Sequence, residues 1–219
     1  MNDNSLGVPE LSANLARQQK TYGDRLRMVE FRRGQTVYAP TSINRSVYLL
    51  VAGEVRLYRL DGDGRRFTLA VLKPGAVFGE ASLLGSLEFE NYAEASEPST
   101  VWIVADSSAR EIFSSYADLS LTLLEGLGQR LVDVEARLEL MAYKKVPARL
   151  AALLLQEMDA SGVVKGLTHQ DLGELLGTYR ETVSQAIREF RSRGLVQPGR
   201  KHILLLDRAE LRRIAEQGE

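Results

Sequence analysis

The chain has 219 residues, of which 44% are hydrophobic and 26% are charged, and its formal net charge is −1. This length allows one large domain or two smaller ones, and the composition is that of a globular protein with a buried core, not of a disordered chain. The chain contains no cysteine and only two histidines, His169 and His202. A disulfide framework, a thiolate zinc site and an iron–sulfur cluster are therefore excluded, and we expect no metal and no cofactor.

The distribution of apolar and charged residues indicates where the protein acts. No apolar run approaches the roughly 18 residues that span a membrane, and no basic and apolar leader opens the sequence. We therefore expect a cytoplasmic protein that does not bind a membrane. Residues 144–219 carry 13 Lys and Arg against 10 Asp and Glu, a net of +3, whereas residues 1–143 have a net of −4. The basic C-terminal part is consistent with binding to nucleic-acid phosphates.

The N-terminal half predicts a β-rich domain. After a short helix expected near residues 9–22, residues 26–105 have the pattern of short strands separated by glycine turns. The clearest signal is a hairpin, in which Glu54–Leu60 and Arg65–Leu72 flank the turn Asp61-Gly62-Asp63-Gly64. Many short strands with glycine turns predict a β-sandwich or a jelly roll.

A heptad pattern follows the β-rich region. Six apolar residues, spaced alternately by three and four, form what we call the heptad seam: Leu124, Leu127, Leu131, Val134, Leu138 and Met141. This 3.5-residue repeat is typical of a coiled coil between two chains, although an amphipathic helix lying on its own domain has a similar stripe. We expect the helix to end near Tyr143-Lys144-Lys145, with Pro147 in the first turn of the next helix.

The C-terminal region predicts two short helices joined by a tight turn and followed by a hairpin. Thr168 and Asp171 have the spacing of a capping box, and Gly177-Thr178-Tyr179 forms the turn. The second helix is expected from Arg180 to Arg193, with one apolar face, and Gly194 ends it. That face consists of Val183, Ala186, Ile187 and Phe190. Two strands, 195–197 and 202–206, are expected around a turn at 198–201. This is the pattern of a winged helix-turn-helix, whose second helix enters the major groove of DNA.

The polar residues of this motif are the candidate DNA contacts. They are Thr168, His169, Tyr179, Arg180, Glu181, Thr182, Ser184, Gln185, Arg188, Arg200 and Lys201. A helix-turn-helix protein that reads two half-sites needs two copies to set their spacing, so this motif and the heptad seam together predict a homodimer on double-stranded DNA. The alternative is a helical packing module with a solvated polar face, which the cap, the turn glycine and the hairpin disfavour.

Four segments carry a resemblance to a known family. FRRGQTVYAP, YLLVAGEVRLY and LKPGAVFGEASLL lie in the β-rich region, and LTHQDLGELLGTYRETVSQAIREFRSRGLV contains the helix-turn-helix. Together they resemble the family of the cyclic-AMP receptor protein and FNR, over nearly the whole chain. The resemblance implies an α+β fold class with an N-terminal jelly roll similar to cyclic-nucleotide-binding domains. A long central dimerisation helix and a C-terminal winged helix-turn-helix would follow it.

The resemblance also implies a division of the chain and roles for its residues. A jelly-roll sensor domain would occupy 1–117, the dimerisation helix 118–145 and the DNA-binding domain 146–219. Arg180-Glu181-Thr182-Val183 matches the core of the family's recognition helix. By family role Arg180 would hold guanine O6 and N7, Glu181 would accept from a cytosine amino group and Thr182 would contact phosphate.

Two further expectations come from the resemblance. Gln185 replaces an Arg of the best-known member, so one base of the half-site is expected to differ, since Gln pairs most naturally with adenine. The family likeness favours an activator, and the loop Asp159-Ala160-Ser161-Gly162 is either a plain connector or the place where such activators touch RNA polymerase.

An effector pocket in the jelly roll is implied at Gly79, Glu80, Asn91, Tyr92, Val134 and Glu135. By family role Glu80 would hold a ribose hydroxyl, unless it is an exposed turn carboxylate. Members of the family hold the cyclic phosphate with an Arg followed by Ser or Thr, and that place falls here at Glu90-Asn91-Tyr92. The family's adenine-contacting Thr-Ser pair corresponds to Val134-Glu135.

The effector expected from these positions is not cyclic AMP. From Pro74 to Ala109 the chain has no Lys or Arg, whereas Glu residues crowd the same stretch, so a phosphate there would meet carboxylates. We expect operator binding without cyclic AMP, either constitutively or under a different ligand. The alternative is a regulator that uses cyclic AMP or another small effector in the jelly-roll pocket, held by distant arginines such as Arg45, Arg56 or Arg65.

A jelly-roll enzyme is the competing class of function. Such an enzyme needs a metal cluster or an activated nucleophile, and the chain has no Cys and no His before His169. The acids Glu80, Glu88 and Glu90 are scattered, as solvated surface residues usually are. We therefore expect no enzyme activity. A ligand-binding module that works without DNA is a third possibility, and it requires that the second helix of the motif does not bind DNA.

Overall fold

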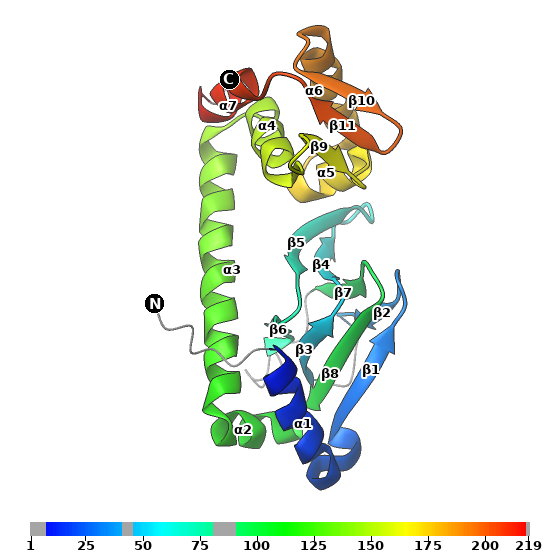
Figure 1. Ribbon diagram of the computed structural model, residues 1–219, viewed down its shortest axis with the longest axis vertical. Coiled ribbons are helices and arrows are strands. Elements are labelled where there is room, and N and C mark those ends of the chain that lie inside the picture. Colours follow the sequence, from blue (N-terminus) through cyan, green and yellow to red (C-terminus); the bar gives the residue numbers. More distant parts are fainter. Residues whose placement is uncertain (1–7, 41–45, 81–90, 218–219) are drawn as a thin grey trace. The chain divides into compact units, whose positions relative to one another are not determined.

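The computed structural model describes residues 8–40, 46–80 and 91–217. The chain divides into two compact units, Met1–Val132 and Asp133–Glu219 (Figure 1). Their boundary falls inside the helix α3, Ala117–Tyr143. Within the described part of the chain, no helix combines the length and the apolar character that a membrane span requires.

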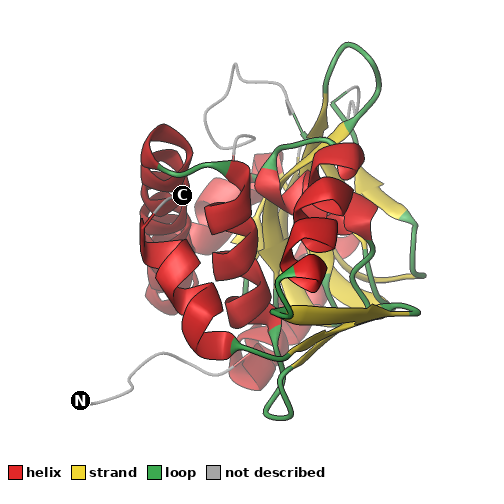
Figure 2. Ribbon diagram, turned by 90° about the horizontal axis from the view of Figure 1, so that it is seen from above, coloured by secondary structure: helices red, strands yellow, loops and turns green. Residues whose placement is uncertain are grey.

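Two antiparallel four-stranded sheets form the N-terminal unit, with strand orders β1-β8-β3-β6 and β2-β7-β4-β5 (Figures 1 and 2). The strands are β1 Leu26–Phe31, β2 Thr36–Tyr38, β3 Ser46–Ala52, β4 Val55–Leu60, β5 Arg66–Leu72, β6 Val77–Phe78, β7 Tyr92–Ala95 and β8 Ser99–Ala105. Two facing sheets in which most neighbouring strands are distant in sequence form a jelly roll, which confirms the predicted fold class.

Helices cover the outer face of the first sheet. They are α1 Val8–Tyr22, the 3-10 turn η1 Gly23–Arg25, α2 Asp106–Ser115 and the start of α3. Their apolar side chains, among them Leu15 and Ile112, are buried against Trp102 of β8. The indole Nε1 of Trp102 donates to Ser12 Oγ at 2.9 Å. The helix expected near residues 9–22 is confirmed as α1, whereas α2 was not predicted.

Local signals explain the turns of the jelly roll. The hairpin β4–β5 forms as predicted, because Asp61 Oδ1 accepts from the backbone N–H groups of Asp63 and Arg65, both at 2.9 Å. Gly79 follows β6 with a φ of +78°, and a Cβ at this position would lie 2.6 Å from the carbonyl oxygen of Ser46. Only glycine fits this corner, since both the backbone conformation and the space exclude a side chain.

The long helix α3 carries the heptad seam. Its 27 residues end at Tyr143, and Pro147 lies in the first turn of the next helix, α4 Val146–Glu157, as predicted. Three seam leucines are more than half exposed, Leu124 at 63%, Leu131 at 59% and Leu138 at 61%. The other seam residues are Val134 and Met141, which are also exposed, and Leu127, which is half-buried.

The C-terminal unit combines helices with a three-stranded sheet of order β10-β11-β9. After α4 it contains β9 Val163–Lys165, α5 His169–Leu176, α6 Arg180–Ser192, β10 Val196–Gly199, β11 His202–Leu205 and α7 Arg208–Gln217. Strand β9 and helix α7 were not predicted. The wing turn is shorter than expected, because Gly199 pairs with His202 and thereby places Pro198 and Gly199 inside β10.

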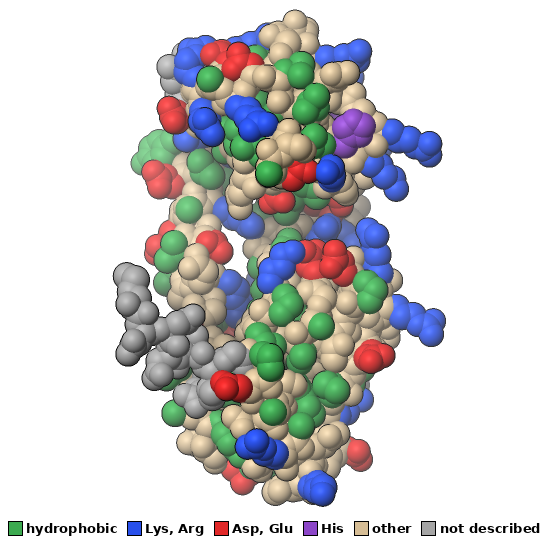
Figure 3. Space-filling model, in the orientation of Figure 1, with side chains coloured by type: hydrophobic (Ala, Val, Ile, Leu, Met, Phe, Trp, Pro, Cys, Tyr) green, Lys and Arg blue, Asp and Glu red, His purple; other side chains and the backbone are tan. Residues whose placement is uncertain are grey.

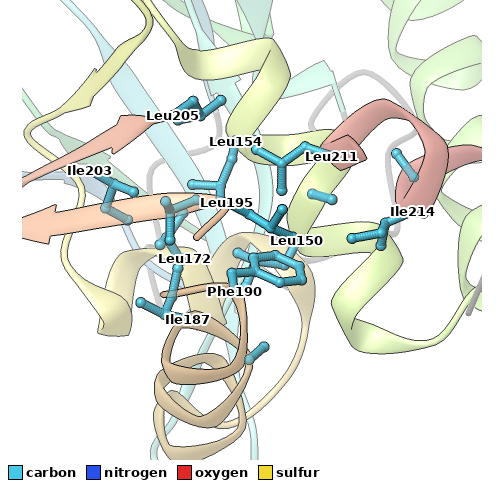
Figure 4. Close-up of a cluster of buried hydrophobic side chains, with 14 of the residues drawn as sticks. Leu150, Leu154, Leu172, Ile187, Phe190, Leu195, Ile203, Leu205, Leu211 and Ile214 are labelled. Atoms are coloured by element: carbon cyan, nitrogen blue, oxygen red, sulfur yellow. The ribbon is translucent and has the colours of Figure 1, made fainter. Parts of the chain in front are cut away.

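One apolar core holds the C-terminal unit together (Figure 4). Phe190 and Ile187 of α6 pack there with Leu150 of α4, Leu172 of α5 and Leu211 of α7. The four residues predicted for the apolar face of α6 are all buried: Val183, Ala186, Ile187 and Phe190. Since this face is buried in the core, the other face of α6 is available for contacts outside the unit.

Candidate nucleic-acid interface

The helix-turn-helix is built by local hydrogen bonds. Thr168 Oγ1 accepts from the backbone N–H of Asp171 at 3.1 Å, and Asp171 Oδ2 accepts from the backbone N–H of Thr168 at 2.9 Å, which is a complete capping box. The chain then leaves α5 at Gly177, whose φ of +63° is left-handed. A Cβ on Gly173 would lie 2.9 Å from the carbonyl oxygen of Thr178, so this glycine allows the close turn.

Polar side chains occupy the outward face of α6. Arg180, Glu181, Gln185 and Arg188 are exposed, while Thr182 and Ser184 are half-buried. Tyr179, immediately before the helix, is also exposed. An Arg fork is suited to the two acceptors of guanine, and a carboxylate to a cytosine amino group, so this face presents the donor and acceptor types that read base edges.

The structure joins His169 to this face. His169 Nδ1 and Ser184 Oγ are hydrogen-bonded at 2.9 Å, which links the start of α5 to the middle of α6. Burial lowers the pKa of His169, and the positive charges of Arg180 and Arg188 lower it further. Both arginines therefore lie close enough to His169 to act on its charge.

The wing adds two further cations. Arg200 and Lys201 are exposed at the turn between β10 and β11, and Lys201 has a φ of +60°. Figure 3 shows Lys and Arg side chains projecting beside a histidine at one edge of the C-terminal unit. Such projecting cations are suited to phosphate contacts, which position a protein on DNA without reading its sequence.

Two of the positions predicted for an effector pocket, Glu80 and Asn91, lie around Tyr38, because the charge of Glu80 acts on its hydroxyl and Asn91 accepts its hydrogen bond. Arg130 of α3 reaches Glu80, with Nη1 at 3.3 Å from Oε1 and Nη2 at 3.4 Å from Oε2, and Nη2 also donates to the carbonyl of Val77 at 3.0 Å. Sequence reasoning missed Arg130, which lies 50 residues from Glu80. The carboxylate of Glu80 is therefore held by an arginine of the same chain. Glu88 and Glu90 lie outside the described residues.

Of the remaining pocket candidates, Asn91 and Tyr92 belong to the N-terminal unit, and Val134 and Glu135 to the C-terminal unit. Tyr38 Oη donates to Asn91 Oδ1 at 2.9 Å, and burial raises the pKa of Tyr38. The ring of Tyr92 stacks on that of Tyr58, with centroids 5.1 Å apart. Val134 and Glu135 of α3 are exposed and belong to the C-terminal unit. In the described residues there is no group of three or more His, Asp or Glu side chains placed to hold a metal ion.

A jelly roll followed by a winged helix-turn-helix defines a class of DNA-binding regulators, and comparison with known proteins agrees. Residues 28–116 match the family profile of a cyclic nucleotide-binding domain, and residues 148–214 match that of a Crp-like helix-turn-helix domain. These profiles together span more than half of the chain. The chain belongs to the CRP/FNR family, whose members are transcription regulators and not enzymes.

Several known regulators are similar to this chain over most of their length. The chain is 31% identical to a CRP-like cAMP-activated global transcriptional regulator of Mycobacterium tuberculosis, covering 87% of this chain and 88% of that protein. It is 28% identical to a global nitrogen regulator of Synechococcus elongatus, covering 83% and 86%. A crystal structure of a CRP/FNR family transcriptional regulator from Thermus thermophilus superposes with a TM-score of 0.72 at 29% identity, covering 88% of this chain and all of that one.

Arg180→Ala is expected to weaken binding to a specific site by about 1–3 kcal/mol and to relax preference at one base pair, because an Arg fork at this position would pair with a guanine. Binding constants on the cognate duplex and on duplexes varied at single positions measure this. Lys201→Ala, the comparison variant on the wing, should weaken all duplexes alike and reduce the salt slope by about 0.9 for each bound copy of the chain. Equal losses for Arg180→Ala on cognate and random duplexes would show that Arg180 contacts only phosphate.

DNA binding is expected to take up a proton at His169. The pKa of His169 is below its ordinary value of about 6.5 in the free protein, and nearby DNA phosphates would favour the charged imidazolium and raise it. Affinity should therefore increase as the pH falls from about 8 to about 6, and His169→Gln should lose part of this dependence. Calorimetry in buffers of different ionisation enthalpy counts the protons. The same proton uptake in both proteins would contradict the assignment.

Proposed function

We propose that this protein is a sequence-specific transcription activator that binds a two-fold symmetric operator as a homodimer in the cytoplasm, independently of cyclic AMP. In this proposal, residues 1–117 form the sensor domain, 118–145 the dimerisation helix and 146–219 the DNA-binding domain. The proposal rests on the outward face of α6. Because the opposite face of this helix is buried in the core, Arg180, Glu181 and Gln185 near its start are exposed. Half-sites about one helical turn apart, ~34 Å, would suit two such helices.

The proposed dimer rests on the heptad seam. A monomeric protein would leave a row of large apolar side chains on α3 in contact with water, among them Leu124, Leu131 and Leu138. Their heptad spacing is suited to packing against the same helix of a second chain, with knobs from one helix entering holes of the other. A symmetric operator and a symmetric seam then share one two-fold axis.

The proposed independence from cyclic AMP rests on the lack of positive side chains that could bind its phosphate. Membership of the family does not assign an effector, since one relative is described as cAMP-activated and another as a nitrogen regulator. In this chain the residues from Pro74 to Ala109 include no Lys or Arg. Arg130 is engaged by Glu80 and the carbonyl of Val77, so a cyclic phosphate would compete with Glu80 for its charge.

Contact with RNA polymerase is proposed at the turn Asp159–Gly162. The carboxylate of Asp159 bonds Lys165 Nζ at 2.6 Å and accepts from the backbone N–H of Ser161 at 2.9 Å and from that of Val163 at 3.1 Å. These bonds hold the pKa of Asp159 below its ordinary value. The turn is therefore an ordered surface feature, as a docking site for another protein requires.

Leu131→Asp should dissociate the dimer, because it places a charge inside an apolar interface, where an unpaired charge costs several kcal/mol. Sedimentation measures the mass, and binding to the symmetric operator should fall with the loss of the dimer. Val132→Asp is the matched control: its side chain is also exposed on α3 but lies off the seam. A dimer that survives Leu131→Asp would place the interface elsewhere.

Cyclic AMP should neither bind tightly nor alter DNA affinity. Isothermal calorimetry of the protein with cyclic AMP, and operator titration with and without it, test this expectation. A micromolar complex that tightens operator binding about tenfold, which is ~1.4 kcal/mol of coupling, would contradict cyclic-AMP independence and favour the alternative of a ligand-dependent regulator.

A further inference from the structure

The C-terminal helix α7 is part of the core of its unit. Leu211, Ile214 and Ala215 are buried there, and Figure 4 shows Leu211 and Ile214 beside Leu150 of α4. This apolar packing holds α7 against α4. Polar contacts at the two ends of α7 add fixed points to neighbouring segments.

One end of α7 is tied to the exit of the recognition helix. Arg193, which directly follows α6, donates through Nη2 to Glu210 Oε1 at 2.8 Å. Glu210 also accepts from Arg213 of its own helix, at 2.7 Å from Nε and 2.6 Å from Nη2. The two arginines hold the pKa of Glu210 below its ordinary value, so the carboxylate is charged when it bonds Arg193. Glu210 therefore joins α7 to the C-terminal end of α6.

The other end of α7 is tied to the exit of α3. Lys144, the residue after the last one of α3, donates from Nζ to the carbonyl oxygen of Ala215 at 2.5 Å. A cation at the last carbonyls of a helix is favourable, because these carbonyls lack partners within the helix and carry its negative dipole end. Lys144, α7 and Arg193 all belong to the unit Asp133–Glu219, which also contains the last three seam residues, Val134, Leu138 and Met141.

We propose that α7, with Lys144, Glu210 and Arg193, is a brace that sets the direction of the recognition helix relative to the last turns of the seam helix. Because the seam would lie on the two-fold axis, this direction determines the distance between the two recognition helices of the dimer. Lys144 and Glu210 are thus positioning residues for operator spacing and contact no base themselves. The proposal rests on dimeric operator binding as proposed above.

The test measures which spacer the protein prefers, the spacer being the base pairs that separate the two half-sites of the operator. The duplex is one that the wild-type protein selects from a random-sequence pool, and its centre is then lengthened or shortened by about one or two base pairs. The wild-type protein should prefer the selected spacer. Glu210→Gln and Lys144→Gln should each reduce that preference about threefold, and the double variant about tenfold, since the two contacts are at opposite ends of α7 and act independently. Affinity for a duplex with a single half-site should stay at the wild-type value.

Matched controls separate positioning from general stability. Glu216→Gln makes the same change on the same helix, and Lys145→Gln makes it on the neighbouring residue; both side chains are exposed. Both controls should keep the wild-type spacer profile. The brace is contradicted if the Glu210 and Lys144 variants keep that profile, or if they lose affinity equally on every spacer and on the single half-site. A wild-type protein without any spacer preference would instead contradict dimeric operator binding.

Discussion

The burial of one face of α6 is the constraint on which the remaining features of the DNA-binding unit depend. Val183, Ile187 and Phe190 enter the core that α4, α5 and α7 share, and they fix the rotation of α6 about its axis. Once this rotation is fixed, Arg180 and Arg188 must face outward, and Ser184 meets His169. The chemistry of the surface is therefore a consequence of the packing beneath it.

Features that depend on neighbours along the chain were predictable from the sequence. The capping box at Thr168, the turn glycine Gly177 and the hairpin at Asp61 each arise from residues within a few positions of one another. The apolar face of α6 follows from helical periodicity alone, and all of it is buried. Short strands with glycine turns predicted a β-sandwich or a jelly roll, and the family resemblance selected the jelly roll, whose strand order joins segments far apart in the sequence.

Features that depend on distant partners were not predictable. Helix α7 has a mostly polar sequence, and its place is evident only when Leu211 and Ile214 meet the core. The contact of Arg130 with Glu80 spans 50 residues, and no local pattern marks the arginine except its place beside the seam. Strand β9 is three residues long and is defined by its pairing with β11. In each case the determining contact forms only in three dimensions, whereas a sequence pattern reports local order.

The buried indole of Trp102 makes the N-terminal unit distinguishable by spectroscopy. It is the sole tryptophan of the chain, it is almost fully buried, and its ring N–H is bonded to Ser12 of α1. Emission excited at the red edge of the protein absorption band therefore originates in the jelly roll alone. Its intensity and wavelength report on the packing of α1 against β8, and they do so in the intact chain without any attached label.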